Sequence, residues 1–149
     1  GMPYEFGYKE REAAYLCAEH SAMEKAIEMV DGHAVIDTTG SVIYLSRVLL
    51  DRFKKVSTVV YLSTADEHLA EMIENFFLHP KPLVWGRHFN LQSNENDEQS
   101  LRRCYPELIH FRLNQYSHLA HMAMAPGFHR DPSFTTEMFL YEVLQHQQP

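Results

Sequence analysis

The stretch Ala34-Val35-Ile36-Asp37-Thr38-Thr39-Gly40-Ser41 is the part of this chain that indicates its fold most directly. Its apolar, β-branched start favours a buried strand, which we expect over residues 33–38. The Thr-Thr-Gly-Ser run that follows has the small residues and the glycine of a tight turn. Gly40 is equally well explained as an ordinary turn glycine or as a residue that lets a ligand approach the backbone.

A helix is predicted before this strand, over residues 8–30. Small apolar residues recur there at three- and four-residue steps, and they include Ala14, Cys17 and Ala22. This spacing places the three residues on the face that we expect to be buried. Asp31-Gly32 should end the helix, since glycine readily takes the left-handed conformation of a helix cap.

Helices and strands also alternate after the turn. The patterns predict, in order, helix 46–55, strand 58–62, helix 63–79, helix 98–119, strand 121–124 and helix 133–145. Pro106 marks either a break in the fourth helix or the first turn of a new one. Between 80 and 97 the chain is polar and rich in proline and asparagine, so we expect a long, lid-like loop that contains Trp85. The order predicts a single α/β domain over residues 1–149, with a parallel sheet flanked by helices.

Composition excludes several classes of protein. The net charge of −7 argues against a general nucleic-acid-binding protein, which needs concentrated positive charge. No apolar run approaches the roughly 18 residues of a membrane span, and the first residues do not resemble a signal peptide. Cys17 and Cys104 are isolated, without the spacing of a metal or redox site. We therefore expect a cytoplasmic protein with reduced thiols.

The run from Val35 to Tyr44 resembles the third-strand signature of the shikimate kinase family of P-loop kinases. Thr58-Val-Val-Tyr-Leu-Ser63 is similar to the fourth strand of that family, and Lys81-Pro-Leu-Val84 resembles its lid, which begins with Arg-Pro-Leu. Cys104-Tyr-Pro-Glu-Leu and Arg112-Leu-Asn-Gln-Tyr116 resemble the helix that follows. The similarity extends over about residues 8–145 in the same order of elements, and it implies a P-loop kinase-like fold.

The resemblance also implies roles for individual residues. Thr39, Gly40 and Ser41 correspond to the substrate-binding turn, and Arg112 to the arginine that binds the carboxylate of the phosphate acceptor. Lys81 corresponds to the lid arginine that neutralises charge at the transferred phosphoryl group, although lysine lacks the two-pronged geometry of arginine. ATP and Mg²⁺ are the cofactors that the resemblance implies for a complete relative.

The chain departs from the family pattern in its phosphate-binding part. It contains no Gly-x-x-x-x-Gly-Lys-Ser/Thr loop and no Gly-Lys pair, so the N-terminal strands and the phosphate loop are missing from the expected fold. The Phe-Arg-x-x-Glu motif of the family corresponds here to Tyr15-Leu16-x-x-Glu19, without the arginine. The first hypothesis is therefore a kinase homologue that is inactive in ATP-dependent phosphoryl transfer as this chain stands.

A second hypothesis is a non-catalytic binding or assembly module built on a degraded kinase fold. The missing phosphate-loop strand would lie between 33–38 and 58–62, which would leave their backbone groups unpaired. We therefore expect a homodimer, and a small anionic metabolite as ligand. His118 and His121 have a spacing that can bind a metal, but no third ligand accompanies them, so we expect no metal site.

Overall fold

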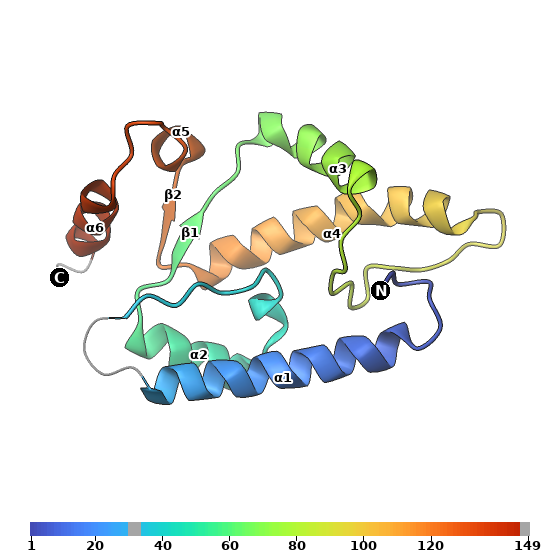
Figure 1. The fold of residues 1–149 in the computed structure, drawn as a ribbon, viewed down its shortest axis with the longest axis horizontal. Helices are drawn as coiled ribbons and strands as arrows, with labels where there is room; N and C mark the ends of the chain where they lie inside the picture. Colours follow the sequence, from blue (N-terminus) through green and yellow to red (C-terminus); the bar gives the residue numbers. More distant parts are fainter. Residues whose placement is uncertain (30–33, 147–149) are drawn as a thin grey trace.

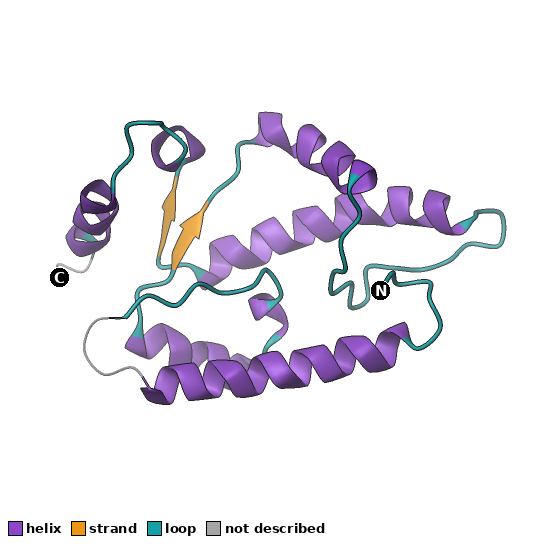
Figure 2. Ribbon diagram, in the orientation of Figure 1, coloured by secondary structure: helices purple, strands orange, loops and turns teal. Residues whose placement is uncertain are grey.

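The computed structural model describes residues 1–29 and 34–146 (Figure 1). Its elements are α1 (Tyr8–Met29), η1 (Val42–Tyr44), α2 (Arg47–Val56), β1 (Val60–Leu62), η2 (Asp66–His68), α3 (Leu69–Leu78), α4 (Asp97–Leu119), β2 (Met122–Met124), α5 (Pro126–His129) and α6 (Thr136–Gln145), where η denotes a short 3-10 helix. Most of the described chain is helical, and a small parallel sheet accompanies the helices (Figure 2). The architecture is thus consistent with an α/β fold only in a loose sense.

The sheet consists of β1 and β2, which run parallel with Val60 opposite Met122 and Leu62 opposite Met124. Both strands were predicted, although they are shorter than expected. Val59 accepts a hydrogen bond at its carbonyl from the His121 amide (2.8 Å), and the Ser63 amide donates to the Met124 carbonyl (2.9 Å). Because alternate residues of a strand face opposite edges, the backbone groups of Val60 and Leu62 face the edge away from β2.

The strand predicted over 33–38 is wrong for the residues that the structure describes. Residues 34–39 form no helix or strand, and Val35 is 86% exposed. A strand requires a neighbour for its backbone groups, and apolar, β-branched composition alone does not supply one. His33, and the helix cap expected at Asp31-Gly32, lie outside the described residues.

The first helix forms where it was predicted, but a different face of it is buried. Ala14, Cys17 and Ala22 are exposed, whereas Tyr8 and Met23 are buried. Large side chains bury more apolar area than alanine or cysteine does, so they determine which face of the helix packs. The prediction of a buried Cys17 is therefore wrong.

Two hydrophobic clusters hold the elements together. One joins α3, α4, the loop between them and the start of α1: Tyr8, Phe76, Trp85, Leu101, Cys104, Tyr105, Leu108 and Ile109. The other joins the second half of α1 to η1 and α2: Met23, Val42, Leu45, Leu49 and Phe53. Trp85 is fully buried and packs against Phe76, Phe89 and Tyr105, so it anchors the long loop within the first cluster.

The longest helix, α4, continues through Pro106 without a break. Asn96 caps its start by accepting from the Gln99 amide (2.8 Å), and the Gln99 side chain accepts from the Asn96 amide (2.9 Å). On either side of the proline, Tyr105 and Leu108 are buried in the first cluster. Proline has no amide hydrogen, so one backbone hydrogen bond of the helix is lost at Pro106. The burial of Tyr105 and Leu108 stabilises the helix despite this loss.

The start of the sheet depends on a histidine side chain. The Val59 amide donates to Nδ1 of His121 (2.9 Å), which can accept only while the imidazole is neutral. Burial, followed by the charge of Lys54, lowers the pKa of His121 below its usual value. His121 is therefore protonated more readily in the unfolded chain than in the folded chain.

We expect the stability of the protein to fall as the pH drops below about 6.5, the ordinary pKa of histidine, and approaches the lowered pKa of folded His121. The substitution His121→Asn should reduce the loss, because the amide oxygen accepts from Val59 at any pH. Urea unfolding midpoints at about pH 7.5 and about pH 5.5 measure this. His110→Asn, at an exposed position of α4, is the control. Equal pH dependence in the wild type and in His121→Asn would contradict the assignment.

Candidate functional site

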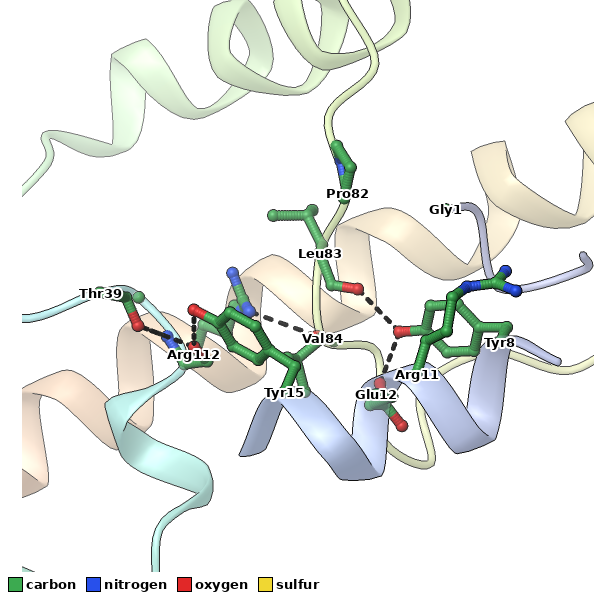
Figure 3. Close-up of a pocket in the computed structure, with 12 residues that line it drawn as sticks. Gly1, Tyr8, Arg11, Glu12, Tyr15, Thr39, Pro82, Leu83, Val84 and Arg112 are labelled. Atoms are coloured by element: carbon green, nitrogen blue, oxygen red, sulfur yellow. Dashed lines mark hydrogen bonds between the residues drawn. The ribbon is translucent and has the colours of Figure 1, made fainter. Parts of the chain in front are cut away.

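A cavity of about 420 Å³ opens between α1, the turn at 39–41, the segment at 82–84 and α4 (Figure 3). It is lined by Gly1, Tyr8, Arg11, Glu12, Tyr15, Thr39, Gly40, Ser41, Pro82, Leu83, Val84 and Arg112. Four of these were candidates from the sequence: Thr39, Gly40, Ser41 and Arg112. The structure brings these four together in one cavity, although Arg112 lies 71 residues beyond Ser41 in the chain.

Hydroxyl groups form a connected cluster at the turn. Thr39 donates a hydrogen bond to Oε1 of Glu19, and its Oγ1 lies 2.7 Å from Oγ of Ser41. Oγ of Ser41 in turn donates to the Tyr15 hydroxyl (3.3 Å). Oε2 of Glu19 is buried without a partner among the described residues. The turn is thus tied to α1 by side-chain hydroxyls, which are also available to a polar ligand.

Gly40 is required at its position because of a close contact with α4. The Tyr116 hydroxyl donates to the Gly40 carbonyl (2.6 Å). A Cβ atom at Gly40 would lie 2.8 Å from that hydroxyl and 3.6 Å from Nη1 of Arg112. A larger residue would force the Tyr116 hydroxyl to move and would weaken its bond to the Gly40 carbonyl, so the glycine serves this close approach rather than a positive φ angle.

Arg112 is the most unusual residue of the site, because it is a buried cation. It is 7% exposed, and Nη2 donates to the Val84 carbonyl (3.2 Å). Its Nε is buried and has no hydrogen-bond partner, and no carboxylate forms an ion pair with it, among the residues that the structure describes. Figure 3 shows the guanidinium between the turn that carries Thr39 and the segment that carries Val84.

Three tyrosines lie near Arg112. Its Cζ lies 5.8 Å from the centre of the Tyr44 ring. Burial raises the pKa of Tyr44, Tyr105 and Tyr116, and the Arg112 guanidinium opposes that rise in each case. All three phenols therefore stay neutral at physiological pH. Among the described residues, no carboxylate neutralises the charge of Arg112 by a direct ion pair, although Glu12 lines the same cavity.

A carboxylate and a phenol hold the segment that forms the outer wall of the cavity. Oε1 of Glu12 accepts from the Trp85 amide (2.7 Å), the Gly86 amide (3.0 Å) and the Tyr8 hydroxyl (2.5 Å). The Tyr8 hydroxyl also contacts the Leu83 carbonyl (2.7 Å). Burial, followed by the hydrogen bond to Glu12, raises the pKa of Tyr8. These contacts keep residues 83–86 beside α1 and the cavity open between them.

Gly86 allows the chain to turn at the end of this wall. Its φ is +56°, in the region that favours glycine, and an added Cβ would lie 3.2 Å from Cε1 of Tyr44. Trp85, just before it, is fully buried. The position of residues 82–84 is thus set by three features. They are the hydrogen bonds of Glu12, the turn at Gly86 and the buried Trp85 side chain.

Lys81, predicted as the catalytic cation, does not line the cavity. It is exposed, and it immediately precedes Pro82, which does line the cavity. The loop between α3 and α4 thus brings Lys81 near the opening without directing it into the site. Asp37 is also exposed and outside the lining.

The two histidines considered as metal ligands have structural contacts instead. Nδ1 of His118 lies 2.8 Å from the Asn114 carbonyl within α4, and His121 accepts from the Val59 amide. No group of three His, Cys, Asp or Glu residues with metal-binding geometry occurs among the described residues.

In the same part of the chain, every helix is too short or too polar to cross a bilayer.

Sequence reasoning missed Tyr8 and Glu12. Their i, i+4 spacing on one face of the predicted helix was a usable signal. Tyr15 and Glu19 also contribute to the site, since Tyr15 lines the cavity and Glu19 binds Thr39.

No protein-family model, curated protein or solved structure matches this chain.

The Glu12 clamp makes a prediction about stability. Glu12→Ala removes the acceptor of two amides and of the Tyr8 hydroxyl, so we expect a loss of about 2–3 kcal/mol, as for hydrogen bonds to charged groups. Hydrogen exchange at the Trp85 and Gly86 amides should also become faster. Urea unfolding and exchange measured by NMR test both effects. Glu10→Ala, an exposed acid on the same helix, should cost less than about 1 kcal/mol. Unchanged protection of the two amides in Glu12→Ala would show that the clamp does not hold the wall.

Proposed function

We propose that this chain is a shikimate kinase-like small-molecule kinase homologue whose cavity binds a small anionic metabolite through Arg112. As it stands, the chain does not carry out ATP-dependent phosphoryl transfer. The observation that carries the proposal is the burial of Arg112 without an acidic partner among the described residues.

The energetic argument rests on the cost of a buried charge. A charge that is removed from water without a partner costs several kcal/mol, even after the surroundings relax. A protein keeps such a group when another molecule supplies the opposite charge. A carboxylate or phosphate in the cavity that Arg112 lines would offset this cost.

The geometry of the guanidinium suits a carboxylate. Arginine has five N–H donors, and the described residues use one of them, in the bond from Nη2 to Val84. The hydroxyls of Thr39, Ser41 and Tyr15 lie in the same cavity and can bind polar groups next to the carboxylate. A hydroxylated carboxylate is therefore the favoured class of ligand, as the resemblance to acceptor sites implies.

The nucleotide side of a kinase site has no counterpart in the sequence. Charge stabilisation in phosphoryl transfer depends on a phosphate loop, its lysine and a hydroxyl that holds Mg²⁺. The chain has no Gly-Lys pair from which such a loop could be built. Lys81 could approach a bound ligand only by movement of the loop between α3 and α4. Two unpaired cysteines agree with the reducing conditions of the cytoplasm, which is the proposed location.

Titration calorimetry with hydroxylated cyclic carboxylates, such as shikimate and quinate, tests the proposal. We expect saturable binding that Arg112→Met weakens about 10- to 100-fold, the loss of a charge-assisted hydrogen-bonded pair. The methyl esters of the same acids should bind as weakly as the acids bind to the variant. At the Arg112 cavity, Mg-ATP should show no affinity tighter than about millimolar, because the sequence contains no phosphate loop.

Arg102→Met is the matched control, because Arg102 lies on the same helix but is exposed and outside the cavity. It should bind the acids as the wild type does. Equal binding by the wild type and Arg112→Met would overturn the role of Arg112. Micromolar binding of Mg-ATP that Arg112→Met weakens would place the nucleotide in this cavity and overturn the proposed loss of phosphoryl transfer.

A second proposed role is assembly, and the open edge of β1 favours it. Val60 and Leu62 direct their backbone groups to an edge that has no neighbouring strand in the described sheet. Leu62 is half exposed, and Val35 in the adjacent unpaired stretch is largely exposed. Open edges with apolar side chains favour pairing with another chain, so we propose a homodimer formed through β1.

Light scattering at micromolar concentration should give the mass of a dimer. Val60→Pro should give a monomer, because it removes an amide that faces the open edge and leaves the pairing of β1 with β2 intact. Circular dichroism should show that this variant keeps its helices. A monomeric wild type, or a dimeric Val60→Pro variant, would contradict a dimer formed through β1.

A further inference from the structure

A second cavity, of about 380 Å³, lies between α2 and the C-terminal end of α4. It is separate from the Arg112 cavity, and the two share no lining residue. Its charged walls are formed by Arg47, Asp51, Lys54 and Lys55 of α2 and by His118 of α4. In a chain with a net charge of −7, this concentration of basic groups is the exception.

The basic groups lie on one short helix. The ten residues of α2 contain four of the 13 lysines and arginines of the chain but a single acid, Asp51. Asp51 already forms an ion pair with Arg47, whose Nε donates to both of its carboxylate oxygens (3.0 and 3.2 Å). Lys54 and Lys55 have no ion pair with a carboxylate among the described residues.

Helix ends compensate only part of this charge. Lys54 and Lys55 lie in the last turn of α2, and Nζ of Lys54 reaches the His118 carbonyl at the end of α4 (3.5 Å). Each helix C-terminus carries about half a negative charge, so two of them offset about one of the two lysines. The charge of Lys54 also helps to lower the pKa of His121, after burial. The walls of this cavity therefore keep an excess of positive charge.

The floor of the cavity is apolar. Ile43, Leu50 and Leu119 line it, and all three pack against the second hydrophobic cluster. A basic rim over an apolar floor suits a ligand that combines an anionic group with a hydrocarbon or aromatic part. A lysine ammonium group is a compact point charge, and it can bind a phosphate from many directions. Arginine, by contrast, binds a planar carboxylate best through two parallel hydrogen bonds.

We propose that this second cavity is a binding site for an organic phosphate monoester, with the phosphate held by Lys54 and Lys55 and the organic part on Leu50 and Leu119. The site does not depend on the proposed function of the Arg112 cavity. No covalent step is involved.

NMR titration of the ¹⁵N-labelled chain with phenyl phosphate tests the proposal. The backbone amide signals of Lys54, Lys55, Gln115 and His118 should shift in a saturable way. Phenol and inorganic phosphate should each bind more weakly, because each lacks one half of the recognised chemistry. The double variant Lys54→Gln/Lys55→Gln should weaken phenyl phosphate binding at least about tenfold.

Arg52→Gln is the matched control, because it removes one positive charge from the same helix at an exposed position outside the cavity. It should change the affinity by less than about twofold. Arg112→Met should leave it unchanged, which separates this site from the other cavity. An equal loss in Arg52→Gln and the double variant would show general charge attraction and overturn the site.

Two further results would also overturn the proposal. The double variant could lose stability without losing affinity, which would show that the lysines serve only as helix caps. Alternatively, phenyl phosphate could fail to shift these amides while the double variant becomes monomeric, which would assign the lysines to an interface between two copies of the chain.

Discussion

A buried positive charge in the middle of α4 determines how the surrounding segments can be arranged. Arg112 is bonded to Val84 on one side and lies against the turn at Gly40 on the other. The three elements meet around the guanidinium, and three tyrosines lie near it. Because a buried charge without compensation is costly, its position is the basis on which we propose a negative ligand in this cavity.

The two cavities differ in how their positive charge is presented. Arg112 is buried, and its guanidinium donates a hydrogen bond to the Val84 carbonyl. Side-chain hydroxyl groups line the same cavity. Lys54 and Lys55 lie near the surface above an apolar floor. The first arrangement favours a carboxylate in a defined orientation, whereas the second favours a phosphate with looser geometry and stronger dependence on salt. One chain of net negative charge thus has two cavities that are lined by basic side chains.

Much of the fold after residue 45 could be predicted from the sequence. The period of Leu49 and Phe53 is typical of an amphipathic helix and indicated α2. The apolar run Val60-Tyr61-Leu62 indicated β1, and its partner β2 follows in the chain. The unpaired stretch at 34–38 could not be predicted, because strand formation there depends on a neighbour elsewhere in the chain. The buried face of α1 was misjudged because alanine and cysteine count as apolar but bury little area.

The site was partly accessible from the sequence. The resemblance selected Thr39, Gly40, Ser41 and Arg112, which do line one cavity. It did not indicate Glu12, whose role depends on backbone amides of a loop more than 70 residues away. Nor could it indicate that Arg112 lacks an acidic partner, since pairing is decided by packing.

The most direct test of this account is the NMR signal of the Arg112 Nε–H group. A buried guanidinium without an acidic partner should give a protected Nε–H resonance that shifts strongly when a hydroxylated carboxylate is added. Assignment through Arg112→Lys, which removes that resonance alone, makes the observation specific. A resonance that does not respond to any carboxylate, or that already shows pairing with an acid of the chain such as Glu19, would contradict the central claim.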